Sequence, residues 1–187
     1  MSLKIKTYNT AEIPTLNEEP LKVFQLASFA DSIIQYIDQY RPEYSRLVRL
    51  HRNAGNRITE MFQSWRWTFP RSGSVQIKPQ KGNATRVVSL SDLGFNSMLE
   101  MSNVLADMDR LPVGQYERAF SRAVSESGLW RLHENGFARP STHFFRHLKI
   151  KELKSENFST EYIANWIGEK NLKNLDYYFN SQFFAEI

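Results

Sequence analysis

Hydrophobic residues recur at intervals of three and four along most of the chain, which is the spacing of one buried helical face. The first such stretch runs from Leu21 to Tyr40. It ends at the Arg41-Pro42 step, because the residue before a proline is disfavoured in the helical conformation. The same spacing predicts later helices within 44–50, 58–65, 96–108, 113–127, 141–154, 159–168 and 171–184. Residues 1–20 are polar and are expected to form an extended lead-in, whose first three residues resemble a tag remnant.

One segment in the first half of the chain breaks the helical pattern. Val75-Gln76-Ile77 alternates between apolar and polar residues, and Arg86 to Leu90 is rich in β-branched residues, so both are typical of strands. Lys81-Gly82-Asn83 between them is a turn signal, and a third strand is predicted at 65–69. We therefore expect an α+β fold that is mainly α-helical, with a small three-stranded antiparallel sheet.

Composition limits the class of protein. The chain has 187 residues, of which 41% are hydrophobic and 13% aromatic, enough for one domain with a substantial core. It has 24 Lys and Arg against 20 Asp and Glu, and the net charge of +4 permits a polyanionic partner without requiring one. The absence of cysteine excludes disulfides and thiolate zinc sites. No apolar run reaches the roughly 18 residues of a membrane span. We expect a globular, cytoplasmic protein.

The clearest candidate chemistry lies in the segment His143-Phe144-Phe145-Arg146-His147. His143 and Arg146 are three residues apart and would project from one face of a helix. An arginine presents a planar fork of donors that matches phosphate oxygens, and a histidine can move a proton near neutral pH. His147 would point elsewhere, and we expect it to be a buried support.

Three other features gain interest only beside this pair. Arg57 has Glu60 three residues on, on the same helical face, which by itself is an ordinary surface pair. Lys81 sits at a predicted hairpin tip, where a lysine is normally only solvated. Tyr177 and Tyr178 belong to an aromatic-rich tail, where tyrosines usually pack with the hydroxyl at the surface.

Taken in order, these segments resemble the catalytic domain of the tyrosine recombinases, the phage integrase family. Ala54–Glu60 is similar to the family's first arginine motif, Lys81–Leu90 to its hairpin lysine segment, and Thr142–His147 to its His-x-x-Arg box. Ile167–Glu169 occupies the place of a Leu-Gly-His motif. In the family the nucleophile is the tyrosine nine residues after this motif, which selects the second of the two adjacent tyrosines, Tyr178. The resemblance covers most of the chain.

The resemblance implies a mechanism that uses no metal and no cofactor. Tyr178 would attack a phosphodiester of double-stranded DNA, leaving a 3′-phosphotyrosyl link and a free 5′-hydroxyl. Arg57 and Arg146 would bind the non-bridging oxygens and stabilise the charge of the transition state. Lys81 would protonate the leaving oxygen, and His143 would assist proton transfer at the tyrosine. Family members usually act as tetramers on two DNA duplexes, so we expect self-association on DNA, although the isolated domain can be monomeric.

One residue departs from the family pattern. Glu169 stands where the family usually has histidine, or sometimes tryptophan, which donates a hydrogen bond to the phosphate. An ionised carboxylate donates no hydrogen bond and repels a phosphate. Three alternatives stay open: a protonated Glu169, a side chain turned away to pair with Lys170 or Lys173, or weakened catalysis.

The sequence leaves more than one function open. The first hypothesis is a site-specific DNA recombinase or integrase of prokaryotic or phage origin, associated with the nucleoid, in which residues 21–187 form the catalytic domain. The residues before 45 are too few for the family's separate N-terminal DNA-binding domain, so we expect that domain to be absent. The second hypothesis is a DNA-binding module of the same fold with impaired chemistry. The third is a helical protein-interaction domain, in which the arginines and histidines are incidental.

Overall fold

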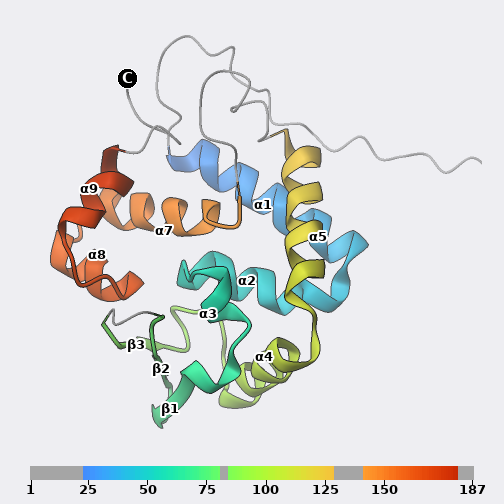
Figure 1. The fold of residues 1–187 in the computed structure, drawn as a ribbon, viewed down its shortest axis with the longest axis horizontal. Helices are drawn as coiled ribbons and strands as arrows, with labels where there is room; N and C mark the ends of the chain where they lie inside the picture. Colours follow the sequence, from blue (N-terminus) through green and yellow to red (C-terminus); the bar gives the residue numbers. More distant parts are fainter. Residues whose placement is uncertain (1–22, 81–83, 129–140, 181–187) are drawn as a thin grey trace, which may run out of the picture.

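The computed structural model describes residues 23–80, 84–128 and 141–180 (Figure 1). The predicted lead-in at 1–20 and the predicted turn at 81–83 lie outside these residues. Helices make up most of the described chain, as predicted: α1 (Val23–Tyr40), α2 (Ser45–Ala54), α3 (Ile58–Met61), α4 (Met98–Arg110), α5 (Val113–Ser127), α7 (Phe144–Ser155), α8 (Thr160–Ile167), α9 (Lys173–Asn180), and the short 3-10 turns η1 (Pro42–Tyr44) and η2 (Ser64–Arg66). Within the described segments, no helix is both long and apolar enough to cross a membrane.

The third helix is shorter than its hydrophobic spacing indicates. The prediction extended it to residue 65, but α3 ends at Met61 and the 3-10 turn η2 follows. The reason is a side-chain contact, because the indole Nε1 of Trp67 donates to the carbonyl oxygen of Glu60 at 2.8 Å. That carbonyl therefore needs no helical N–H from the next turn, and the chain leaves the helix and enters the sheet.

The strands form one antiparallel sheet in the order β1-β2-β3, with β1 at Trp67–Arg71, β2 at Ser74–Ile77 and β3 at Arg86–Ser89. This confirms the predicted three-stranded sheet, although β1 starts at residue 67 rather than 65 because η2 precedes it. Side chains alternate between the two faces, and Val75, Ile77 and Val88 point into the core. Ile77 pairs with Arg86, and β3 contacts α8.

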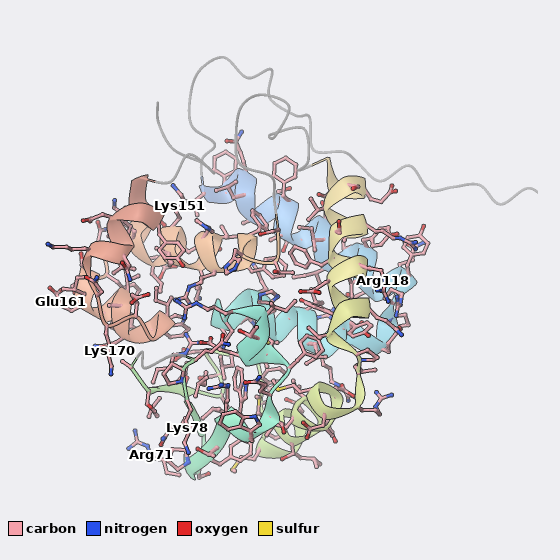
Figure 2. All side chains as sticks on the ribbon, viewed as in Figure 1. Arg71, Lys78, Arg118, Lys151, Glu161 and Lys170 are labelled. Carbon is pink, nitrogen blue, oxygen red and sulfur yellow. The ribbon has the colours of Figure 1, made fainter. Side chains whose placement is uncertain are left out.

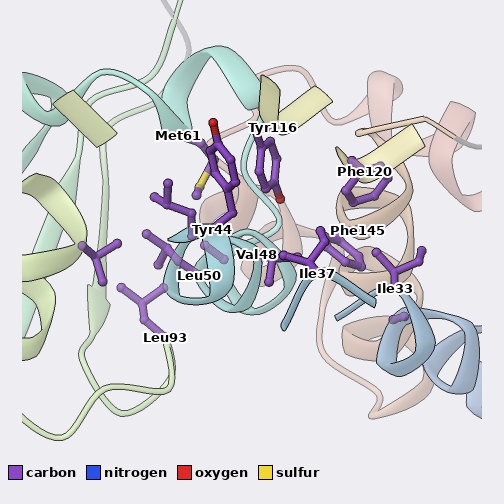
Figure 3. Packing of buried hydrophobic residues seen from close by; sticks show 14 of the residues in the cluster. Ile33, Ile37, Tyr44, Val48, Leu50, Met61, Leu93, Tyr116, Phe120 and Phe145 are labelled. Carbon is purple, nitrogen blue, oxygen red and sulfur yellow. The ribbon is translucent and has the colours of Figure 1, made fainter. Parts of the chain in front are cut away.

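The main core lies between α1, α2, α5 and α7, where α7 contacts both α1 and α2, and α1 contacts α5 (Figure 1). Four aromatic side chains fill part of its centre, as Figure 3 shows: Tyr44, Tyr116, Phe120 and Phe145. Phe145 makes an edge contact with Phe120, with ring centroids 5.1 Å apart. Because Phe145 is adjacent to Arg146, this packing also fixes the start of α7, where the candidate chemistry lies.

A second apolar cluster joins α7, α8 and α9. Its buried residues are Ile150, Leu153, Ile163, Ala164, Ile167 and Leu175. The start of α8 agrees with the sequence prediction, because the Ser159 hydroxyl accepts the amide of Tyr162 at 3.2 Å and caps the helix. The rings of Tyr178 and Phe179 pack against the cluster. The cluster therefore holds α9 beside α7.

The aromatic core yields a stability prediction. We expect Phe145→Ala to lower the free energy of unfolding by about 3–5 kcal/mol, because it removes a fully buried ring and leaves a cavity. Phe24→Ala is the matched control and should change it by less than about 0.5 kcal/mol, because Phe24 is 68% exposed. Urea denaturation of the three proteins measures both values. Equal losses in the two variants would contradict the assigned core.

Candidate active site

Arg146 lies in the first turn of α7 and has no exposed surface. Its Nη1 donates to the carbonyl oxygens of Gly55 and Ile167, both at 3.1 Å. Its Nε donates to the Tyr178 hydroxyl oxygen at 3.2 Å. Its Nη2 is also buried, and no acceptor among the described residues binds it. Burial lowers the pKa of Arg146, but a guanidinium stays charged at neutral pH. One charged donor of Arg146 is therefore left without an acceptor in the described part of the protein.

Arg57 lies immediately before α3 and supplies a second such donor. Its Nη2 is 3.5 Å from Glu169 Oε2, and its Nη1 is 3.5 Å from Glu60 Oε1. The contact with Glu60 is an ion pair without hydrogen-bond geometry, so Nη1 is buried with no acceptor among the described residues. Burial lowers the pKa of Arg146 most, and the charge of Arg57 adds to the effect. The two guanidiniums therefore lie within each other's electric field.

Glu60 lies beside the Arg57 guanidinium, and it also fixes the backbone around this arginine. Its Oε2 accepts the Arg57 amide at 3.2 Å and the Asn56 side-chain amide at 3.3 Å. Its Oε1 accepts the amide of Gln80 at 3.3 Å. A carboxylate that is 2% exposed is thus bound by three donors. It connects the Arg57 segment to Gln80.

Lys81 lies outside the described residues, so its place relative to the site stays a prediction. The described residues nearest to Lys81 on each side, Gln80 and Ala84, bind site segments directly. Gln80 donates its amide to Glu60, and Ala84 donates its amide to the carbonyl oxygen of Gly168 at 3.2 Å. Gln80 and Ala84 are therefore hydrogen-bonded to the segments that carry Arg57 and Glu169.

His143 precedes α7, whereas the sequence prediction placed it inside the helix, because α7 begins at Phe144. Its backbone angles are nevertheless helical, with φ at −74° and ψ at −12°, so the backbone of His143 continues the helical path that leads to Arg146. Burial lowers the pKa of His143, and the charges of Arg146 and Arg57 lower it further. The imidazole is therefore neutral at pH 7 and able to accept a proton.

Tyr178 reaches the site from α9. Its hydroxyl oxygen accepts the hydrogen bond from Arg146 Nε, and its ring centroid is 5.7 Å from Arg146 Cζ. The ring of His147 lies 4.8 Å from that of Tyr178. His147 is buried, as the sequence predicts, and supports the tyrosine from behind. The side chain of Tyr177 is outside the description, so only the second tyrosine is placed.

Glu169 points into the site and not toward the neighbouring lysines. Its Oε2 is 3.5 Å from Arg57 Nη2, and its Oε1 accepts from Asn174 Nδ2 at 3.2 Å and from the Asn171 amide at 3.3 Å. In the described part of the chain it makes no ion pair with Lys170 or Lys173, so that alternative is wrong. The left-handed cap of α8 at Gly168, with φ at 72°, directs the next residue inward. A carboxylate therefore holds one side of the Arg57 fork.

Arg86 is a third buried arginine, and the sequence analysis gave it no role. Its side chain is 5% exposed, and it binds Asn56, Ala54 and Trp166. The signal was available in the strand alternation, because Arg86 lies on the same face of β3 as Val88. Burial lowers the pKa of Arg86 to about 9.

The basic side chains that Figure 2 labels do not gather on one part of the molecule. Figure 2 labels Arg71 and Lys78 near the sheet, Arg118 on α5, Lys151 on α7 and Lys170 after α8, on separate parts of the molecule. This dispersal fits the mild net charge of +4.

Comparison with known proteins identifies the fold. No protein-family model and no curated protein sequence matches the chain. The chain is similar to a lambda integrase dimer bound to a COC′ core site, with a TM-score of 0.61 and 16% identity over 86% of this chain and 47% of the integrase chain. It is similar to the XerH site-specific recombinase bound to difH substrate, with a TM-score of 0.57 and 14% identity over 86% of this chain and 49% of the XerH chain. It is also similar to a lambda integrase tetramer bound to a Holliday junction, with a TM-score of 0.57 and 19% identity over 82% of this chain and 45% of the integrase chain.

The chain therefore has the fold of a tyrosine recombinase catalytic domain, as its ordered motifs predict. It spans about half the length of the recombinases that it matches.

The buried support of the tyrosine yields a pH prediction. Burial lowers the pKa of His147 to about 3, and nearby positive groups add to this, whereas an unfolded histidine titrates near about 6.5. Below that pH the unfolded chain binds the extra proton, so stability is complete above about pH 6.5 and falls as the pH drops toward 3. Burial lowers the pKa of His51 to about 3 too, so His51 contributes a second, equal dependence.

We predict that His147→Phe keeps the ring contact with Tyr178. The variant should lose the contribution of His147 to the pH dependence of stability and keep that of His51. The unfolding free energy of the variant should fall less steeply between pH 6 and 4, by about 1.4 kcal/mol per pH unit. Urea denaturation at a series of pH values measures the slope. Between pH 7 and 8 the two slopes should agree, which is the internal control. Equal slopes below pH 6 would show that His147 is not held neutral.

Proposed function

We propose that this chain is the catalytic domain of a site-specific recombinase or integrase that cleaves and rejoins double-stranded DNA through a 3′-phosphotyrosyl intermediate. One observation carries the proposal: Arg146 binds the Tyr178 hydroxyl beside two buried N–H groups, one of them from Arg57, that have no acceptor among the described residues. A phosphodiester has two non-bridging oxygens, and charged donors of this kind bind them strongly. The tyrosine oxygen then lies next to the position proposed for the phosphate.

The proposed reaction needs no external reactant. The Tyr178 oxygen attacks the phosphorus and passes its proton to His143, while the bond from phosphorus to the 5′-oxygen breaks and Lys81 protonates that oxygen. Arg57 and Arg146 stabilise the added charge of the transition state. In the second step a DNA 5′-hydroxyl attacks the phosphorus of the phosphotyrosyl link and returns its proton to Lys81, while the bond from phosphorus to Tyr178 breaks and His143 protonates the tyrosine oxygen. One ester replaces another, so rejoining requires no ATP.

We propose that the protein assembles into a tetramer on DNA. Support comes from the solved structures of the same fold, which include a lambda integrase tetramer bound to a Holliday junction and XerH bound to difH. The mild net charge of +4 predicts weak, salt-dependent DNA binding by the domain alone. In this proposal assembly on DNA adds the remaining affinity.

A second candidate function is a DNA-binding module of this fold with impaired chemistry. The observation that favours it is the ion pair between Glu169 and Arg57. A carboxylate already holds one side of a guanidinium that the phosphate needs, and it repels the phosphate when ionised. In this case the site binds DNA but forms the covalent link slowly or not at all.

The two candidates differ in one covalent product. We predict that the wild-type chain forms a denaturation-resistant adduct with nicked duplexes randomised around the nick, and that Tyr178→Phe forms none, because it lacks the attacking oxygen. Tyr177→Phe is the matched control and should retain the adduct. Gel analysis of labelled DNA measures this. An adduct in Tyr178→Phe would refute the assigned nucleophile, and DNA binding without any adduct would favour the second candidate.

The ion pair of Glu169 yields a separate prediction. Glu169→Gln should bind duplex DNA about tenfold more tightly, a gain of about 1.4 kcal/mol, because it removes a buried negative charge beside Arg57 and keeps the side-chain shape. Glu161→Gln on the exposed face of α8, labelled in Figure 2, removes the same charge away from the site and should change the affinity less than twofold. Fluorescence anisotropy with a short duplex measures both. Weaker binding by Glu169→Gln would show that the carboxylate assists DNA binding.

A further inference from the structure

Two buried guanidiniums bind the same pair of backbone segments. Arg146 Nη1 donates to the carbonyl oxygens of Gly55 and Ile167. Arg86 Nη1 donates to the carbonyl oxygens of the preceding residues, to Ala54 at 3.2 Å and to Trp166. The end of α2 and the end of α8 are therefore joined twice, by charged donors on adjacent carbonyl groups. Arg146 belongs to the proposed phosphate site, and Arg86 lies behind it.

Arg86 also fixes the residue before Arg57. Its Nη2 donates to Asn56 Oδ1. Asn56 is fully buried, and its amide nitrogen donates to Glu60 Oε2 at 3.3 Å. The same carboxylate oxygen accepts the Arg57 amide. A chain of hydrogen bonds therefore runs from Arg86 through Asn56 and Glu60 to the backbone of Arg57.

On its other side, Arg86 fixes the segment that carries Glu169. The Trp166 carbonyl that it binds is three residues before Glu169. Near this contact, Ala84 donates to the Gly168 carbonyl, and a Cβ on Gly168 would lie 3.0 Å from the Ala84 carbonyl oxygen. The start of β3 is thus in close contact with the end of α8. Arg86 binds both the segment that carries Arg57 and the segment that carries Glu169.

Packing alone is a poor reason for an arginine at this position. Arg86 occupies an inward position of β3, where Val88 is apolar. Burying a charge is costly, and well-packed apolar residues at such positions are often equally stable or more so. The guanidinium contributes what an apolar side chain cannot, which is donors in a rigid fork directed at three separate acceptors.

We propose that Arg86 is a positioning residue of the phosphate site, which sets the geometry of Arg57 and of the α8 end without touching the phosphate. This inference rests on the proposed function, because it assumes that Arg57 binds a phosphate oxygen. Burial lowers the pKa of Arg86 most, and the positive charges of Arg146 and Arg57 lower it further, which shows that the three arginines repel one another. In this proposal the negative charge of a bound phosphate offsets that repulsion.

Inorganic phosphate is the probe that tests the inference, because its binding requires no particular DNA sequence. Its dissociation constant is measured by NMR titration of the ¹⁵N-labelled chain, following the amide signals of Gly55 and Gly168. We expect Arg86→Lys to weaken phosphate binding at least fivefold, because a lysine keeps the charge but loses the fork. Arg46→Lys is the matched control and should stay within twofold, because Arg46 pairs with Asp107 outside the site.

A double-mutant cycle separates positioning from a general loss of stability. If Arg86 acts through Arg57, then Arg86→Lys should change phosphate affinity less than twofold when Arg57→Ala is already present. Asn56→Ala breaks the same hydrogen-bond chain and should reproduce the Arg86→Lys effect, which provides a second route if Arg86→Lys folds poorly.

Three outcomes decide between the accounts. The positioning role would be overturned, and the phosphate site would stand, if Arg86→Lys weakened phosphate binding equally in the wild-type chain and in Arg57→Ala. Wild-type phosphate affinity in both Arg86→Lys and Asn56→Ala would have the same consequence. Wild-type phosphate affinity in Arg57→Ala, or no phosphate binding by the wild-type chain, would instead overturn the proposed phosphate site, and the role of Arg86 with it. A loss through Arg86 that requires Arg57 would support both.

Discussion

Arg146 carries a positive charge in a position closed to water, and the surrounding backbone is arranged to stabilise it. Such a charge is tolerated only where it is well hydrogen-bonded. Here the carbonyl oxygens of Gly55 and Ile167 accept from one nitrogen, and the Tyr178 hydroxyl accepts from another. These contacts bring together the ends of α2 and α8 and the face of α9. The geometry of the whole site follows from this one buried group.

The same arrangement sets up a competition for Arg57. Glu169 holds one side of its guanidinium, and Glu60 lies on another side. A phosphate has to bind the remaining donors or displace the Glu169 carboxylate. The tyrosine recombinases that the sequence resembles usually have a histidine or tryptophan at the corresponding position, which would add a donor, whereas Glu169 supplies a carboxylate. Glu169 therefore bears on the proposed chemistry of the site, while the fold matches that of the tyrosine recombinase catalytic domains.

Most of the fold could be predicted from the sequence, because hydrophobic spacing determines which helical face is buried. The boundary of α3 could not, since it depends on Trp67, a residue of the sheet whose indole binds the Glu60 carbonyl. Among the residues that the motifs predicted, Arg146 contacts Tyr178 and Arg57 contacts Glu169. Lys81 lies outside the described residues, so its place stays a prediction. The partner of Glu169 could not be predicted, because Arg57 is 112 residues away in sequence. Strand alternation could have identified Arg86.

The central claim is that Arg57 and Arg146 bind one phosphate group beside Tyr178. A crystal structure of the Tyr178→Phe variant with a duplex that it binds tests this most directly. The account predicts a single backbone phosphate whose non-bridging oxygens lie about 3 Å from Arg57 Nη1 and Arg146 Nη2, with the phenyl ring of the substituted residue next to the phosphorus. A phosphate on only one of these arginines, or DNA on another face with both donors still unbound, would contradict it.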